Sequence, residues 1–355
     1  MRVLVQKKLL VTAVASACAL PAAALAQIPP ELQIYGRANV TYERITISNS
    51  PVAANNQSNW EVVDNSSRIG IRGKKDLGGG LSGFFQVESR VRLDSGGDVL
   101  SSRDSYIGMQ GGFGTGKLGR TIGPVYYATY DYISNHNHDT GTSSDALLAP
   151  TVFGNQGFMN NTLWYTSPKL GAFTVDVALS RLGEARVTTL SQPQYIGIVG
   201  AYDQGPLHLA VSHASTKNTS DLGGGKASSD TAFTIGGLYD FNKRFIFGAL
   251  LEKATSDLLV GEAKRNYYRF SLMMPVDKHE FHINYGKVNH RLDANLSDDG
   301  ATQWTLGYNY NITKEFKVYG FYTVVDNQVN GNYGFRTASA GVDNKSIAIG
   351  ARYNF

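Results

Sequence analysis

Six arginines in the first third of the chain are the residues best suited to act as a group, because a guanidinium keeps its positive charge at physiological pH. Such a group cannot exchange protons as a catalytic acid or base. No GxSxG, HExxH or paired-carboxylate pattern accompanies it. Fixed positive charges that share a surface attract and orient anions, so we expect electrostatic rather than catalytic chemistry. The six are Arg37, Arg68, Arg72, Arg90, Arg92 and Arg120.

The segments around these arginines alternate apolar and polar residues with a period of two. Every second residue is apolar between Ser346 and Phe355, and the same division recurs at 32–43, 173–180 and 304–310. Such alternation predicts β-strands with two unlike faces. The polar face carries many small residues and the apolar face carries aromatics at strand ends, which fits a barrel with water inside and lipid outside.

Strand parity sets the direction of the basic side chains. Apolar residues at 69, 71, 85, 87 and 91 take the outward positions. The alternate positions, which hold Arg68, Arg72, Glu88, Arg90 and Arg92, therefore point inward. Arg37 joins them from the first strand, and Arg120 ends its strand where regular alternation stops. We therefore predict a basic wall inside the barrel; the competing interpretation is that these arginines are merely solvated.

The spacing of turn residues predicts the number of strands. Seven hairpins with one further strand at each end give sixteen strands, enough to enclose an aqueous channel rather than a filled core. A propeller is disfavoured because each period of about 36 residues holds two strands, not four. The seven short turns are predicted at 76–80, 111–114, 167–171, 203–206, 240–243, 275–278 and 311–314. Longer exposed loops are predicted on the opposite side near 45–59, 93–102, 182–193, 216–230, 255–264, 290–301 and 326–344.

One long segment, Thr121 to Phe158, interrupts this rhythm and is called the insert below. A 38-residue irregular segment inside a regular β chain is usually functional. We expect its tyrosines to pack it against the barrel wall and its acids to face the arginines. A metal site or pH gate at His136, His138 and Asp139 is disfavoured against solvated loop histidines, so we expect neither metal nor cofactor. The constriction residues predicted are Tyr126, Tyr127, Tyr130, Asp131, Asp139 and Asp145, with Tyr132 as a further anchor.

The N-terminus has the pattern of a secretory signal. Three basic residues precede an apolar stretch that ends at Ala24-Leu25-Ala26, so residues 1–26 are predicted to be removed and 27–355 to form the barrel. Without them the chain has 30 basic (33 − 3) and 29 acidic residues, which gives no support to a nucleic-acid partner. Cys18, the only cysteine, lies in this signal. No later apolar run reaches the length of a membrane helix, which leaves a β-barrel as the membrane structure.

Several motifs resemble the Gram-negative general diffusion porins, particularly those of β-proteobacteria. The motifs are Ser67–Gly73, Asp76–Leu81, Phe85–Glu88, Phe113-Gly114 with Leu118–Arg120, Asn161–Pro168 and Tyr353–Phe355. The resemblance covers the mature chain and most strongly supports Arg68 and Arg120 as pore residues. It implies a homotrimeric, sixteen-stranded outer-membrane barrel among lipid and lipopolysaccharide. It also implies a third loop folded into the lumen, with Phe355 as the signal read by the outer-membrane assembly machinery.

Phe158 departs from the pattern of these porins, which often carry an arginine shortly before the segment that corresponds to Asn161–Pro168. A continuous series of basic residues along the lumen wall is therefore in question. Six candidate bases against three acids in the insert still predict a mild anion preference in a channel for ions and small hydrophilic solutes.

Other functions remain alternatives. An eighteen-stranded, substrate-specific channel would need one more hairpin, and an adhesin would need longer loops. A barrel phospholipase is suggested by His213 and Ser215, which stand two residues apart, but no polar partner for them is identifiable.

Overall fold

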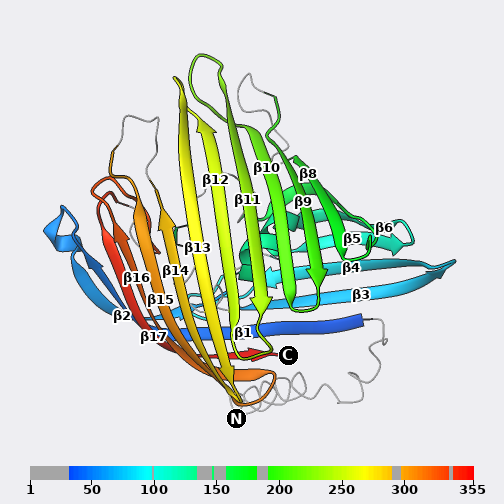
Figure 1. Cartoon of the computed structure of the whole chain (residues 1–355), viewed down its shortest axis with the longest axis horizontal. Coiled ribbons are helices and arrows are strands. Elements are labelled where there is room, and N and C mark those ends of the chain that lie inside the picture. Colours follow the sequence, from blue (N-terminus) through cyan, green and yellow to red (C-terminus); the bar gives the residue numbers. More distant parts are fainter. Residues whose placement is uncertain are drawn as a thin grey trace, which may run out of the picture.

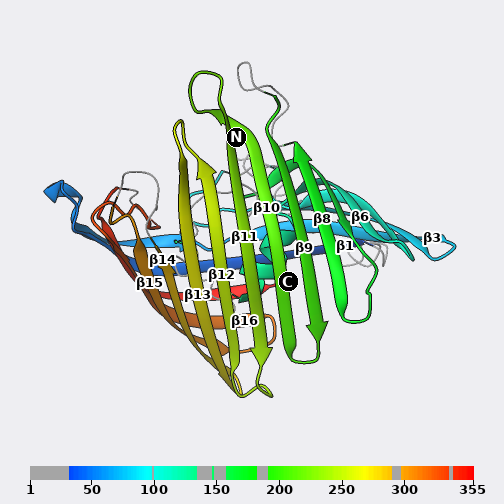
Figure 2. The same cartoon turned by 45° about the horizontal axis from the view of Figure 1, so that its top comes forward.

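One continuous antiparallel sheet makes up the computed structural model, and its first and last strands pair, so the sheet closes into a barrel (Figures 1 and 2). The structure describes residues 32–97, 100–133, 146–147, 157–181, 191–289, 297–335 and 339–355. The predicted signal, residues 1–26, lies outside them. The strands are β1 (Leu32–Ser48), β2 (Gln57–Asp64), β3 (Arg68–Gly78), β4 (Leu81–Arg90), β5 (Ser105–Gly111), β6 (Gly114–Thr121), β7 (Met159–Thr166), β8 (Phe173–Arg181), β9 (Gln194–Gln204), β10 (Leu207–Asp221), β11 (Ala227–Asp240), β12 (Ile246–Asp257), β13 (Glu262–Val276), β14 (His279–Val288), β15 (Ala301–Asn311), β16 (Phe316–Asn327) and β17 (Asp343–Asn354).

The seventeen strands occupy sixteen positions around the barrel wall, and each such position is called a stave below. β1 pairs with β3 along its first six residues and with β2 further on, so β2 and β3 are two halves of one interrupted stave. Ser66 adopts φ 62° at the break. Asn39 bridges the break, because its backbone N–H donates to Ser67 Oγ at 2.9 Å and its Nδ2 donates to the Asn65 carbonyl at 2.9 Å. The predicted number of sixteen strands is confirmed.

All seven predicted short turns join consecutive strands at the predicted places, from the β3–β4 turn to the β15–β16 turn. Two of the loops on the opposite side are less than half as long as predicted. β10 and β11 leave only residues 222–226 between them, and β12 and β13 leave only 258–261. Their Ser, Thr, Asn and Asp residues continue the strand ladder. We predicted loops in these two segments because their residues are polar, and polar residues indicate exposure to solvent. A pair of strands that extends beyond the membrane is exposed to water on both faces, so its residues are polar as well.

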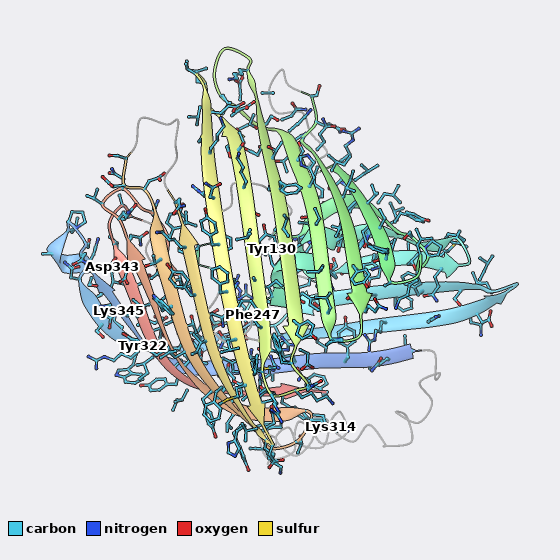
Figure 3. The ribbon with its side chains drawn as sticks, viewed as in Figure 1. Tyr130, Phe247, Lys314, Tyr322, Asp343 and Lys345 are labelled. Carbon is cyan, nitrogen blue, oxygen red and sulfur yellow. The ribbon has the colours of Figure 1, made fainter. Side chains whose placement is uncertain are left out.

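The two faces of the barrel differ as the alternation predicts. On β15, Leu306 is 52% exposed on the outside, whereas Thr305 and Asn309 on the inside are buried. Figure 3 shows side chains projecting from the strands all round the wall. An outer band of exposed apolar side chains is what a surrounding bilayer requires. No helix among the described residues is long and apolar enough to cross a membrane.

The insert begins with a helix where the sequence predicted irregular chain. A π-helix, η2, spans Tyr126–Asp131, and its neighbours on both sides are also helical. Inside the barrel, Thr129 and Ile133 pack against the glycines of the inner wall: a Cβ at Gly236 of β11 would lie 3.5 Å from each of them. Gly236 of β11 and Gly248 of β12 thus leave room for these two residues at the inner wall. The tyrosine-rich sequence shows no period of two, and this wall stabilises it as a helix.

Candidate functional site

Three arginines stand side by side on the inner wall. In the strand register Arg37 of β1 is opposite Arg68 of β3, and Arg68 is opposite Arg90 of β4. We call Arg37, Arg68 and Arg90 the arginine row. Neighbouring strands lie about 4.8 Å apart, so the row brings three guanidinium groups across three adjacent staves.

Carboxylates of the same wall hold parts of this row in place. Arg68 lies 3.9 Å from Glu88, and Arg90 lies 3.7 Å from the buried carboxylate of Asp64. Glu88 is nearly buried and also accepts a hydrogen bond from the Tyr35 hydroxyl at 3.0 Å. The sequence placed Glu88 on this face but gave no signal that it would pair with arginines.

A further arginine, Arg103, belongs to the same cluster and was not predicted. Its Nε donates to Glu88 at 2.5 Å. The residue precedes β5, outside any alternating segment, so parity could not assign it to the wall. Its guanidinium carbon lies 5.1 Å from the centre of the Phe158 ring, and that of Arg120 lies 5.5 Å from the same centre. The ring of Phe158 therefore contacts two arginines.

The remaining predicted bases lie in different surroundings. Arg120 donates to the Ser102 carbonyl at 3.2 Å and to the Asn160 side chain. Arg72 donates to Gln33 at 2.8 Å and lies over the Tyr35 ring. Arg92 lies beyond the end of β4 at Arg90 and is exposed, so strand alternation does not set its direction.

The described part of the insert contacts two opposite walls of the barrel. Tyr127 donates its hydroxyl to Asp104, just before β5, and its ring stacks on Trp164 of β7 with centres 6.1 Å apart. Burial, and then the Asp104 carboxylate, raise the pKa of Tyr127, so its hydroxyl keeps the proton that it donates. At its other end, Ser271 of β13 donates to the Ile133 carbonyl.

A histidine clamp fixes the middle of this segment. The His208 ring on β10 stacks on Tyr132 with centres 3.6 Å apart, and its Nε2 lies 2.8 Å from the Ala128 carbonyl. Its Nδ1 lies 2.6 Å from the Asp203 carboxylate. We call His208 and Asp203 the histidine clamp. The sequence predicted Tyr132 as an anchor but not His208. A single inward-facing histidine on a strand has the same pattern as any other polar residue of the lumen.

The other predicted constriction residues divide into two groups. Tyr130 is buried within the barrel (Figure 3) and stacks on Tyr126 with centres 6.2 Å apart, while Asp131 is half-buried. His136, His138, Asp139 and Asp145 lie outside the described residues. Among the described residues no cluster of His, Cys, Asp and Glu could hold a metal ion.

Phe355 lies at the seam where the barrel closes. Its backbone N–H donates to the Gly36 carbonyl at 3.1 Å, and its carbonyl accepts from the Gly36 N–H at 2.9 Å. Its ring lies on Gly36, where a Cβ would be only 2.3 Å from it. On the outer wall, His213 is exposed and is opposite Phe233 and Ile198 in the register, neither of which could orient it for catalysis.

Comparisons with known proteins agree with this architecture. The family model described as Gram-negative porin matches residues 12–331. Outer membrane porin protein 32 of Delftia acidovorans is 28% identical over 304 residues, 82% of this chain and 85% of that protein. A local match of 36% over 104 residues, 29% of this chain and 30% of that protein, links it to major outer membrane protein P.IB of Neisseria meningitidis serogroup B.

Solved structures share the whole barrel. The anion-selective porin from Comamonas acidovorans superposes with a TM-score of 0.78 and 25% identity over 91% of this chain and 99% of its own. OmpF of Salmonella typhi shares the fold with a TM-score of 0.69 and 17% identity, over 91% of this chain and 97% of its own. With a closed sixteen-stranded barrel, a polar lumen and a family match over most of its length, the chain belongs to the Gram-negative porins, the non-enzymatic passive channels of the outer membrane.

Proposed function

We propose that this porin favours small anions, and that the arginine row is the feature responsible. Six guanidiniums (the row with Arg72, Arg103 and Arg120) lie with three carboxylates, those of Glu88, Asp64 and Asp104, so among these nine groups the positive charges exceed the negative charges by three (6 − 3). A charged wall of low dielectric constant concentrates counter-ions at its surface. The anion-selective Comamonas porin, at 25% identity, supports the same preference here.

The insert would supply the opposite side of the constriction. β11 lies eight staves from β3 in a ring of sixteen, so η2 rests on the wall that faces the arginine row. Leu147, further along the insert, is buried against Gly286 of β14. These contacts support a loop that crosses the lumen, with Asp131 and the predicted Asp139 and Asp145 on its path.

The reversal potential of the purified protein in a planar bilayer under a KCl gradient tests the preference. The wild type should be anion-selective, and R37Q/R68Q should lose most of that selectivity. K278Q/K314Q, which removes two bases from short turns outside the lumen, is the matched control and should leave the selectivity unchanged. Clear cation selectivity of the wild type would reject the proposal.

Two further measurements test the constriction. Deletion of residues 131–149 should raise single-channel conductance, and unchanged conductance in a folded variant would place the loop outside the lumen. Liposome swelling with sugars of graded size should show a size limit that this deletion relaxes. Swelling that does not depend on sugar size would count against a general diffusion pore.

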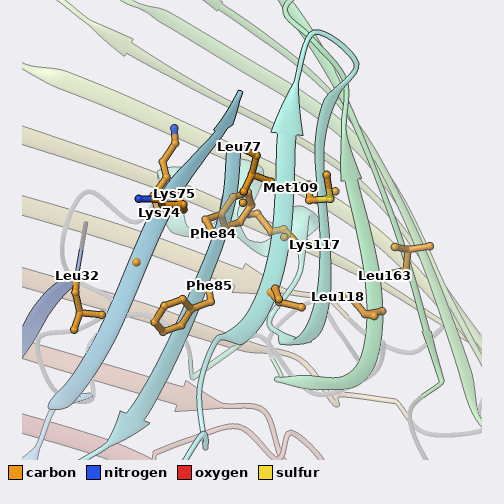
Figure 4. A pocket seen from close by; sticks show the side chains of 15 residues that line it. Leu32, Lys74, Lys75, Leu77, Phe84, Phe85, Met109, Lys117, Leu118 and Leu163 are labelled. Carbon is orange, nitrogen blue, oxygen red and sulfur yellow. The ribbon is translucent and has the colours of Figure 1, made fainter. Parts of the chain in front are cut away.

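We also propose that the protein is a homotrimer that associates through the outer face of β3–β6. An apolar hollow of about 820 Å³ opens there, and Phe85, Met109 and Leu118 are among the residues that line it (Figure 4). Gly116 also lines it. A Cβ at Gly116 would meet nothing within 4 Å, so G116L should leave the monomer fold intact but dissociate the trimer on a native gel. Gly200, equally unobstructed on the outward face of β9, gives the control G200L, which should stay trimeric.

The ends of the chain complete the proposal. Removal of residues 1–26 would leave Gln27 as the first residue, which N-terminal sequencing of membrane-extracted protein tests. Phe355 would be read by the outer-membrane assembly machinery, and the outer surface would contact lipid and lipopolysaccharide. No nucleic-acid partner is proposed.

A further inference from the structure

A groove on the outer wall over β7–β10 combines an apolar floor with a basic rim. It has a volume of about 430 Å³, within the range of small-ligand sites. Leu163, Leu179 and Ile196 line its floor, whereas Arg181 and Lys217 line its rim. All five stand at outward positions of their strands, so the groove faces the membrane and not the lumen.

The rim lies at the outer edge of the membrane band. Along the outward face of β8, apolar side chains run from Phe173, next to a short turn, to Leu179, and Arg181 is the first charged residue beyond them. Six residues of strand span about 20 Å, close to the roughly 25 Å apolar band of such barrels. Short turns face the periplasm in this class of barrel, so Arg181 reaches the level of the outer-leaflet head groups.

The two basic residues are arranged as a pair. Both Arg181 of β8 and Lys217 of β10 are opposite Gln194 of β9 in the strand register, so two strand spacings, about 10 Å, separate their backbones. Gln194 accepts a hydrogen bond from Arg181 Nη1 at 2.6 Å, which orients the guanidinium beside the groove. Within the described ranges neither base forms an ion pair with a carboxylate.

We propose that this groove binds one phosphorylated lipid of the outer leaflet, with a phosphate between Arg181 and Lys217 and an acyl chain on Leu163, Leu179 and Ile196. The proposal rests on the proposed contact with lipopolysaccharide and is independent of the anion preference of the lumen. An arginine fork matches phosphate oxygens, and the head-group region strengthens the contact by partial desolvation. Charge and apolar surface therefore favour the same ligand at the height where such lipids lie.

Ser215, one of the two residues that suggested a lipase, acquires a different role in this site. It lines the groove on β10, two residues before Lys217, and it is nearly buried. Its small side chain gives the groove depth. Ser215→Leu should fill that space without any change of charge.

Lipid retention by the detergent-extracted full-length protein tests the proposal. The protein is incubated with a diphosphorylated glucosamine lipid of the lipid A type, and bound lipid is counted by native mass spectrometry. R181E/K217E should bind it about tenfold more weakly, as expected for the loss of two charge-assisted contacts. S215L should also bind less. K278E/K314E, which reverses two bases at the opposite end of the barrel, should bind like the wild type.

Three comparison arms identify the ligand and its competitors. The dephosphorylated lipid and inorganic phosphate alone should each bind poorly, because each offers only half of the contact. Equal retention of phosphorylated lipid by R181E/K217E and the wild type would overturn the proposal. The proposal would also be overturned if R181E/K217E lost the trimer but bound lipid as the wild type does. That result would mean that a second copy of the chain, and not a lipid, covers the groove. Conductance recorded on the same samples separates failure of this site from failure of the channel.

Discussion

The histidine clamp should determine how firmly the insert is held, and His208→Ala is the perturbation that tests it. The change removes a hydrogen bond to the Ala128 carbonyl at 2.8 Å, the link to Asp203 and a ring stack on Tyr132 at 3.6 Å. A buried hydrogen bond contributes about 1 kcal/mol and an aromatic pair about 1 kcal/mol. The clamp therefore contributes about 2 kcal/mol of anchoring.

A loss of about 2 kcal/mol multiplies the population of released inserts roughly thirtyfold. Single-channel recordings should then show excursions to higher conductance that are rare in the wild type. Limited proteolysis within the insert should also become faster. Asp203→Asn, which keeps the shape but removes the charge, should give a smaller effect in the same direction. The double variant should not exceed H208A, because both residues act through one contact.

His213→Ala is the matched control, because this histidine lies on the same strand but faces outward. H213A should record like the wild type. If H208A and H213A had the same conductance, noise and rate of cleavage, the clamp would not hold the insert. The anchoring would then belong to the other contacts of the insert, among them those of Tyr127 and Ile133.

Three other changes test separate parts of the structure. Arg90→Ala should destabilise the barrel by about 1–2 kcal/mol in urea unfolding, because it leaves the buried Asp64 carboxylate without its pair at 3.7 Å; a change below about 0.3 kcal/mol would show that the pair is not stabilising. Phe158→Leu should keep the fold but reduce anion selectivity, since two cation–π contacts, each worth about 0.5–1 kcal/mol, no longer hold Arg103 and Arg120; Phe158→Tyr should retain the selectivity. Deletion of Phe355 should lower the refolding yield in detergent, because two seam hydrogen bonds are lost, and an unchanged yield would assign this residue to recognition alone.

The barrel could be predicted from the sequence because its signals are local. Each short turn carries its own Gly, Asn, Asp or Pro, and each stave carries its own alternation, so neither depends on distant residues. The hairpins at Asp240 and Pro275 are examples, predicted from four residues each and present in the structure. Local signals do not predict the ends of strands that extend beyond the membrane into water, as the β10–β11 pair does.

The site could be predicted only where a side chain sits on a regular strand. Arg68 and Arg90 follow from parity, but the register that aligns them with Arg37 depends on pairings between residues 31 (68 − 37) and 22 (90 − 68) positions apart. Arg103 and His208 were missed for the same physical reason. Their roles come from partners such as Glu88 and Ala128, which meet them only after the barrel has closed.

The seam between β1 and β17 has a consequence for the folding kinetics. Every other pairing joins staves that are neighbours along the chain, whereas this one matches Arg37 with Asn354 and continues over twelve residue pairs. Until it forms, two strand edges expose unpaired backbone groups, which invite pairing with other chains. Because residues so distant in sequence meet slowly, closure should be the slow step of assembly and the open sheet its aggregation-prone intermediate.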